Sequence, residues 1–220
     1  LYKNPNIDLD NKNKKIDILS AISLRGMILP HDKIVSNSKL CGYTMDYVKG
    51  KSIFELNLSK KQLIELFKKI SSYLKYYHQY GIVLADFNLS NLLFTSSDSF
   101  YFVDIDSAKI LNLPHDSIPT ITYNFLKSYG YDVNKIVVDE HFDNLSLFLN
   151  FFYILFEGNP LYNLSLYEIE KYMETKEVDD QKPFVKELLH YQHQIPYFEQ
   201  VFRWLNEKSI RRSRIINVFN

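Results

Sequence analysis

The chain has 220 residues, enough for one good hydrophobic core or for one domain and part of another. Its 26 basic and 26 acidic residues give a formal net charge of zero, so charge gives no reason to expect nucleic acid or an anionic membrane as a partner. A single cysteine, Cys41, excludes an internal disulfide, and no apolar run approaches the roughly 18 residues of a membrane span, so we expect a cytoplasmic protein.

The opening residues are typical of a fragment. The chain begins at Leu1 rather than Met, and residues 1–3 resemble the end of a strand that Asn4-Pro5 stops. Apolar residues at helical spacing then predict a short amphipathic helix over residues 14–24. Short strands are predicted next, over residues 28–30, 33–36 and 39–47.

The longest predicted helix covers residues 60–80. Ser59 is a suitable N-cap, and Gly81 stands where a left-handed residue costs least. Apolar residues three and four positions apart form one stripe, which we expect to be buried. The stripe consists of Leu63, Leu66, Phe67, Ile70, Leu74 and Tyr77.

Two apolar, β-prone runs follow this helix, and each delivers a carboxylate to a loop. Residues 82–94 contain Asp86 and, five positions later, Asn91; the run over residues 100–103 ends at Asp104. Mg²⁺ prefers hard oxygen ligands from few protein groups, which leaves positions for water and phosphate. An Asp turn with a capping Asn would explain the first pair equally well, but the second carboxylate favours a metal- and phosphate-binding site.

The remainder of the chain is predicted to be mainly helical. Residues 113–132 are Tyr-rich and predicted to be irregular, and residues 143–157 are apolar nearly all round, which predicts a buried helix. Further helices are predicted over residues 166–175, 183–193 and 197–207. This order predicts an α+β protein with a small sheet-bearing part and a larger helical part.

These motifs resemble those of the protein kinase-like superfamily. Residues 82–94 and 100–107 are similar to its catalytic loop and metal-binding segment, and residues 43–50 (Tyr-Thr-Met-Asp-Tyr-Val-Lys-Gly) are similar to the segment that joins its two lobes. The resemblance is to a divergent bacterial-type Ser/Thr kinase-like domain that is incomplete at its N-terminus. It implies a partial N-lobe and hinge over residues 1–48 and a mainly helical C-lobe over residues 49–220.

The resemblance implies a catalytic role for three residues. Asp86 would accept the proton of the substrate hydroxyl, and Asn91 and Asp104 would hold Mg²⁺ between the phosphates of ATP. Asp143 opens the run Asp-Asn-Leu-Ser-Leu, which is similar to the start of a buried kinase helix. There it would accept hydrogen bonds from backbone N–H groups of the catalytic loop, and a plain N-cap Asp is compatible with that role.

The resemblance also implies the residues that surround the adenine. Met45 would line the back of the pocket, and Leu93 would form the floor beneath the base. The backbone carbonyl of Asp46 and the N–H of Val48 would bond the adenine edge. By itself this segment is equally typical of an ordinary edge strand that ends in a glycine turn.

The chain departs from the family pattern at several positions. Leu84-Ala85-Asp86 replaces His-Arg-Asp, so activation through a phosphate-clamping Arg is not expected, and Asn88 stands where a phosphate-supporting Lys is common. Asp104-Ile105-Asp106 replaces Asp-Phe-Gly, which removes a backbone hinge. Such loops resemble those of divergent bacterial kinase-like proteins, including proteins associated with tellurite-resistance clusters.

The expected phosphate-binding front end is absent from the sequence. No Gly-rich loop precedes the hinge, and Lys3 is the only candidate for the lysine that contacts the α- and β-phosphates, so we expect further sequence upstream. In the first predicted helix, Lys15 stands at the register of the Glu that would pair with such a lysine. Asp17, two residues later, is a substitute, although an exposed helical Asp explains it as well.

The leading interpretation is an ATP- and Mg²⁺-dependent phosphotransferase that modifies Ser or Thr of a protein substrate. One alternative is a pseudokinase-like scaffold that binds a nucleotide or a protein; Ala85, Asn88 and the missing front end favour it. A second alternative is a small-molecule kinase of the aminoglycoside or choline type. The hinge and the Asp143 motif favour a protein kinase over this class, and Asp86, Asn91 and Asp104 together favour an enzyme over a scaffold.

Overall fold

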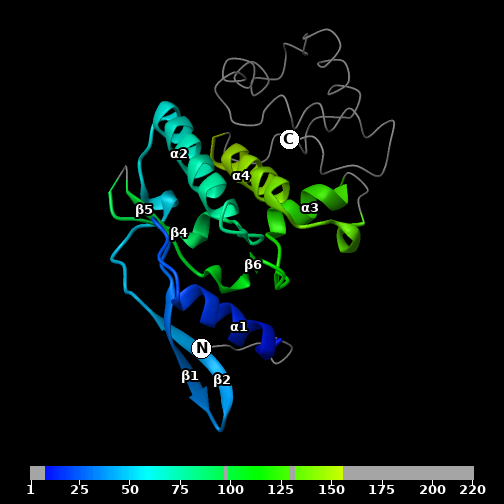
Figure 1. Cartoon of the computed structure of the whole chain (residues 1–220). Helices are drawn as coiled ribbons and strands as arrows, with labels where there is room; N and C mark the ends of the chain where they lie inside the picture. Colours follow the sequence, from blue (N-terminus) through cyan, green and yellow to red (C-terminus); the bar gives the residue numbers. More distant parts are fainter. Residues whose placement is uncertain (1–7, 97–98, 129–131, 156–220) are drawn as a thin grey trace. The chain divides into compact units, whose positions relative to one another are not determined.

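The computed structural model describes residues 8–96, 99–128 and 132–155 (Figure 1). Lys3 and the helices predicted over residues 166–175, 183–193 and 197–207 lie outside this part of the chain. The described residues form a mixed α+β structure with four α-helices and three two-stranded antiparallel sheets. This confirms the predicted α+β class.

The contacts divide the chain into two compact units. The first contains the described residues up to Leu58 together with Lys75–Ile118; the second contains Ser59–Leu74 together with the described residues from Pro119 onward. The lobe boundary predicted at residue 48 stays a prediction.

Helix α1 (Leu9–Ser20) belongs to the first unit and begins five residues before the predicted start. The Asp8 carboxylate is the reason, because it accepts a 3.0 Å hydrogen bond from the Asn11 N–H and so caps the first turn. Ile16 and Leu19 are fully buried, as expected for the apolar face. The helix ends at Ser20 rather than residue 24, where the Ala21 N–H turns back onto Ile18 and Leu19.

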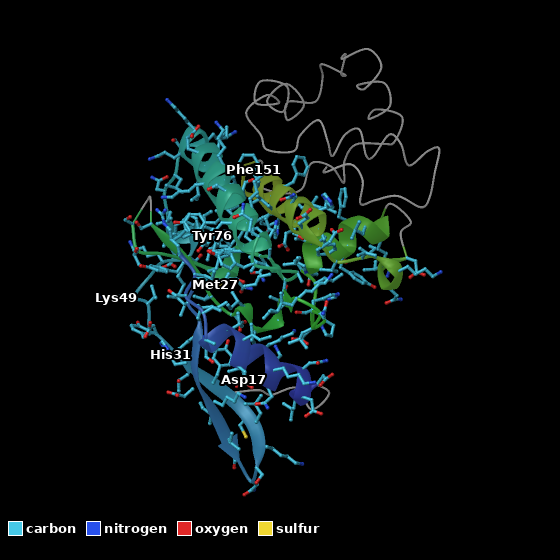
Figure 2. All side chains as sticks on the ribbon, in the orientation of Figure 1. Asp17, Met27, His31, Lys49, Tyr76 and Phe151 are labelled. Carbon is cyan, nitrogen blue, oxygen red and sulfur yellow. The ribbon has the colours of Figure 1, made fainter. Side chains whose placement is uncertain are left out.

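A hairpin of β1 (Pro30–Ser36) and β2 (Lys39–Met45) follows α1. The two turn residues, Asn37 and Ser38, both have positive φ, as a type I′ hairpin turn requires. The strand predicted over residues 33–36 is part of β1, whereas of the strand predicted over residues 28–30 only Pro30 belongs to it. The register of β1 is irregular between Pro30 and Lys33. Figure 2 shows the side chains of this hairpin spread apart, whereas those around Met27 are crowded.

Two short sheets carry the loops of interest. Strand β3 (Ile82–Val83) pairs with β6 (Lys109–Ile110), and β4 (Leu92–Phe94) pairs with β5 (Phe100–Phe102). Alternation along β4 buries Leu92 and Phe94 and leaves Leu93 half-buried. The pairing of β4 with β5 confirms the two predicted strands, whereas β6 was not predicted.

Helix α2 (Lys60–His78) confirms the longest prediction, although it ends two residues early. Ser59 and Gln62 form a reciprocal capping box: the Gln62 N–H donates to the Ser59 hydroxyl at 3.3 Å, and the Ser59 N–H donates to the Gln62 side chain at 2.9 Å. All six residues of the predicted stripe are buried. Gly81 has φ of +70°, so the predicted left-handed residue is confirmed.

The second unit also contains α3 (Thr120–Ser128) and α4 (Glu140–Leu155). The prediction that residues 113–132 are irregular is wrong, because α3 lies within them and buries Phe125 and Leu126. A 2.9 Å hydrogen bond joins the hydroxyls of Thr122 and Ser146 and links the two helices. No helix in the described ranges is long and apolar enough to cross a membrane.

Helix α4 is buried on nearly all sides, as its composition predicts, but it begins three residues before Asp143. The cap is Asp139, whose carboxylate accepts hydrogen bonds from the N–H groups of His141 and Phe142 at 3.0 and 3.2 Å. Asp143 therefore lies inside the first turn, and the alternative interpretation of it as a plain N-cap is wrong. Packing of α4 on the N-terminal part of α2 brings the rings of Phe67 and Phe151 to 4.3 Å between centroids.

Candidate functional site

The β4–β5 hairpin brings Asn91 and Asp104 together. Leu92 pairs with Phe102, so Asn91 just before β4 and Asp104 just after β5 lie at the same end of the hairpin. The Val103 N–H donates to the Asn91 carbonyl at 2.9 Å and extends the ladder to this point. Two of the predicted site residues are therefore neighbours because of strand register.

Asp104 adopts a left-handed backbone conformation, with φ of 58° and ψ of 47°. Asp and Asn tolerate this region better than most residues, and such conformations cluster at functional sites. The residue is exposed to solvent on one side. Partial burial is the main factor that raises the pKa of its carboxyl; Asp106 raises it further, while Lys12 opposes the shift and Asp86 adds to it.

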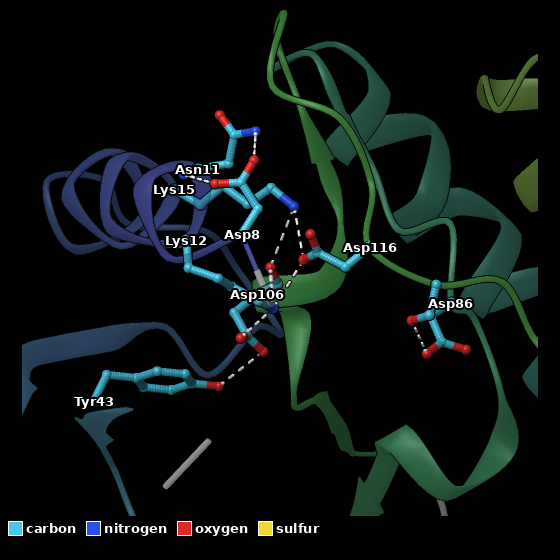
Figure 3. A network of polar contacts seen from close by, with 9 residues as sticks. Asp8, Asn11, Lys12, Lys15, Tyr43, Asp86, Asp106 and Asp116 are labelled. Carbon is cyan, nitrogen blue, oxygen red and sulfur yellow. Dashed lines mark hydrogen bonds and ion pairs between the residues drawn. The ribbon is translucent and has the colours of Figure 1, made fainter. Parts of the chain in front are cut away.

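Asp86 lies in a tight turn beside these residues. Ala85 has φ of +60°, and the Asp86 N–H bends back onto the Leu84 carbonyl at 2.6 Å. The Asn91 side-chain NH₂ donates to the Asp86 carbonyl at 3.3 Å, which connects the predicted base to the predicted metal ligand. The Asp86 carboxylate accepts a 2.7 Å hydrogen bond from the Ser117 hydroxyl (Figure 3).

The oxygen atoms of this site suit a magnesium ion bound with few protein ligands. The Asn91 NH₂ donates to the Asp86 carbonyl, so the amide presents its Oδ1, to which Ser90 makes a long 3.5 Å contact. With the Asp104 carboxylate this makes two hard oxygen ligands, the arrangement in which Mg²⁺ retains water and phosphate. Among the described residues, no group of three or more His, Cys, Asp or Glu side chains is arranged to hold a metal.

A lysine–aspartate network, made of the buried Lys12, Lys15 and Asp106 and the more exposed Asp116, lies beside the site (Figure 3). The Lys12 ammonium contacts the carboxylates of Asp106 at 2.5 Å and of Asp116 at 2.8 Å, and Lys15 contacts Asp116 at 3.0 Å. Lys12 also donates to the Asp106 backbone carbonyl at 2.9 Å. Two cations therefore face two anions, which is the condition for burying charges.

The network changes the titration of its members and of a neighbouring tyrosine. Lys15 is fully buried, and this desolvation lowers its pKa against the opposing effect of Asp116. The Tyr43 hydroxyl donates to the second oxygen of Asp106 at 3.3 Å. Burial is the main factor that raises the pKa of Tyr43, and the negative charges of Asp106 and Asp104 raise it further. The phenol therefore stays protonated and remains a donor.

Sequence reasoning missed the network, although a signal was present. Lys12 and Lys15 stand at helical spacing from Ile16 and Leu19 and so lie on the apolar face of α1. Because the helix was predicted to begin at residue 14, Lys12 was left out. Asp17 is exposed and pairs with Lys33 of β1 at 2.6 Å, in agreement with its interpretation as an exposed helical Asp.

Three of the predicted nucleotide-binding residues lie at the end of β2 and just after it, and the fourth, Leu93, lies in β4. Met45 ends β2 and is 45% exposed, and Asp46 pairs with His31 through side chains 3.0 Å apart. Beyond the half-buried Val48, the backbone of Lys51 exchanges two 2.8 Å hydrogen bonds with Phe94. The end of the predicted hinge is thereby held against the strand that carries Leu93.

Gly50 lies close against β4. A Cβ added to Gly50 would lie 3.0 Å from the Leu93 Cβ and 3.2 Å from the Phe94 carbonyl oxygen. We expect Gly50→Ala to push the two segments apart and to lower the free energy of unfolding by about 1–3 kcal/mol, measured by urea denaturation. Lys49→Ala, at the exposed neighbouring position, is the control and should change stability by less than about 0.5 kcal/mol. Equal stabilities for the two variants would contradict the close approach.

The last predicted site residue, Asp143, lies in the first turn of α4 and is fully buried. It belongs to the second compact unit, whereas Asp86, Asn91 and Asp104 belong to the first. Its predicted hydrogen bonds to the catalytic loop stay a prediction.

The sequence was compared with models of protein families and with curated proteins, and no match was found. The chemistry proposed for this site therefore depends on the residues described above. They are a carboxylate in a tight turn, two oxygen ligands at a hairpin end and a charge-balanced network beside them.

Proposed function

We propose that this chain is an ATP- and Mg²⁺-dependent phosphotransferase of protein kinase-like fold that phosphorylates Ser or Thr of a protein substrate. The observation that carries the proposal is the convergence of Asp86, Asn91 and Asp104. Strand register joins the last two, and a hydrogen bond joins Asn91 to Asp86. This set combines a proton acceptor with magnesium ligands, which phosphoryl transfer to a hydroxyl requires.

Each residue has a distinct task in this proposal. The Asp86 carboxylate accepts the proton of the attacking hydroxyl, and the turn at Ala85 fixes its direction. Asn91 and Asp104 hold Mg²⁺, which neutralises charge on the ATP phosphates. Backbone groups of Asp46 and Val48 bond the adenine edge, with Met45 behind the base and Leu93 beneath it.

The lysine–aspartate network is a support for this site and does not supply the cation that contacts phosphate. The Lys12 ammonium already contacts Asp106 through a carboxylate and a carbonyl oxygen, and Asp116 through a carboxylate. A lysine has three N–H donors, so these contacts use its capacity. In the proposed enzyme, the phosphate-contacting cation is therefore not Lys12.

One observation favours the second candidate function, a nucleotide-binding scaffold without turnover. Asn88 replaces the lysine common at this position, and its side chain caps the short helix Leu89–Asn91 by accepting a 2.9 Å hydrogen bond from the Ser90 N–H. It therefore serves the loop backbone and adds no positive charge near the transferring phosphate. A scaffold would bind Mg²⁺–ATP through Asn91 and Asp104 and release no product.

The test is to measure Mg²⁺-dependent ATP binding by calorimetry and ADP formation with protein and small-molecule acceptors, for the full protein and for Asp86→Asn. We expect Asp86→Asn to retain ATP binding and to lose at least about 100-fold in rate, because the proton acceptor is gone. Asp32→Asn, an exposed carboxylate on β1, is the control and should keep the full rate.

Each alternative has its own outcome. ATP binding without ADP formation would replace the enzyme by the scaffold. Transfer to small hydroxylated compounds in preference to proteins would identify a small-molecule kinase. The absence of Mg²⁺–ATP binding would contradict both kinases and the nucleotide-binding scaffold, and would leave a scaffold that binds a protein.

A further inference from the structure

The Ser117 hydroxyl occupies the position at Asp86 that a phosphoacceptor would need. Its Oγ donates to the Asp86 Oδ2 at 2.7 Å. A general base must lie within about 2.6–3.2 Å of the group whose proton it takes, and this contact meets that condition before any substrate is present. We propose that Ser117 is an intramolecular phosphoacceptor, so that the protein phosphorylates its own chain at this residue; the inference rests on the function proposed above.

Ser117 is held at this position by its neighbour, Asp116. The Asp116 N–H donates to the Ser107 carbonyl at 3.1 Å, and the Asp116 carboxylate contacts the ammonium groups of Lys12 and Lys15. Backbone and side chain of residue 116 are thus both fixed, and the next residue is directed to Asp86. Figure 3 shows Asp116 facing the ends of both lysines, with Asp86 to one side.

Ser117 is also accessible, since it is only partly buried. Its position in the same chain as Asp86 makes transfer a unimolecular event once ATP is bound, and such proximity contributes strongly to rate. Ser90 provides a contrast, because its hydroxyl bonds the Asn88 side chain, an amide that does not accept a proton at neutral pH.

The proposed step balances without any further reactant than a nucleoside triphosphate. The Ser117 Oγ attacks the γ-phosphorus, and an Oγ–P bond forms while the bond from this phosphorus to the β,γ-bridging oxygen breaks. The Oγ proton passes to the Asp86 Oδ2, and the nucleoside diphosphate leaves with the electron pair of the broken bond. Asp86 then returns the proton to water.

The product of this step should slow further phosphoryl transfer by the same molecule. A phosphoserine carries about −1.5 to −2 charges at neutral pH and has lost its hydroxyl donor. Such a group at Ser117 would lie beside the negative charges of Asp86 and Asp104. We therefore expect the modified protein to transfer phosphate to other acceptors more slowly than the unmodified protein.

The test is to incubate the full protein with γ-labelled ATP and Mg²⁺, map the labelled residue by mass spectrometry and vary the protein concentration. We expect label on Ser117, with a rate per molecule that does not depend on concentration. Ser117→Ala should lose this label, and Ser117→Thr should retain it because the hydroxyl is kept. Ser72→Ala, which removes an exposed hydroxyl on α2, is the control and should be labelled like the parent protein.

The outcomes separate this inference from the proposed function. Unchanged labelling of Ser117→Ala, or a rate per molecule that rises with concentration, would overturn the intramolecular acceptor. If ADP is still formed with an added protein in those experiments, the proposed function stands. If no ADP is formed with or without an added protein, both are overturned.

Discussion

Asp104→Asn is expected to abolish Mg²⁺-dependent phosphoryl transfer while it raises the melting temperature. Loss of the charged Mg²⁺ ligand removes several kcal/mol of transition-state stabilisation, which corresponds to a rate decrease of roughly a thousandfold or more. The gain in stability has two causes. Asn tolerates the left-handed conformation at φ of 58° well, and the change removes a carboxylate that lies near Asp106 and Asp86.

The sign of the pH dependence follows from the raised pKa of Asp104. A carboxyl with a higher pKa in the folded state than in the unfolded state favours folding at acid pH and loses that advantage as the pH rises. The gain in melting temperature of Asp104→Asn should therefore be largest near neutral pH and should vanish at acid pH. Thermal unfolding at both pH values measures it, and a lower melting temperature for the variant at neutral pH would contradict this account.

Of the substitutions proposed here, Lys12→Met is expected to cause the largest loss in the free energy of unfolding. Lys12 and Asp106 are each 3% exposed, so removal of the cation leaves a buried, uncompensated carboxylate. Breaking such a pair costs about 3–5 kcal/mol in the free energy of unfolding, which urea denaturation measures. Lys12→Met combined with Asp106→Asn should recover part of this loss, because the two residues are coupled.

Lys33→Met is the matched control for Lys12→Met. Lys33 also pairs with an aspartate, Asp17, at 2.6 Å, but the side chains of this pair are 24% and 64% exposed. Solvent screens such a pair, and its loss should cost less than about 1 kcal/mol. Similar losses for Lys12→Met and Lys33→Met would show that the network is not the buried support described here.

Local signals in the sequence were sufficient for several elements. The stripe of α2 and its Ser59 cap follow from residues within a few positions of one another, and so does the left-handed Gly81. The convergence of Asn91 with Asp104 was also predictable, since a short turn between two strands places their outer ends together.

The predicted starts of two helices were wrong because a polar side chain caps each helix before its apolar pattern begins. Asp8 starts α1 among Asn and Lys residues that give little apolar periodicity, and Asp139 starts α4 before its apolar run begins. Helix α3 is only nine residues long, so its apolar pattern is short. A contact with another helix, the hydrogen bond between Thr122 and Ser146, also holds it. The spacing of Lys12 and Lys15 indicated two lysines on the apolar face of α1, but their aspartate partners could not be predicted because they lie far apart from them in sequence.

That separation has a consequence for the order in which the protein is made. Lys12 and Asp106 are 94 positions apart, and Lys15 and Asp116 are 101 apart. At synthesis rates of about 5–20 residues per second, α1 leaves the ribosome about 5–20 seconds before its carboxylate partners. During that interval both ammonium groups remain hydrated, because burial without counter-charges is too costly. The nascent chain therefore keeps α1 at its surface and encloses it only when the segment that carries Asp106 and Asp116 has emerged.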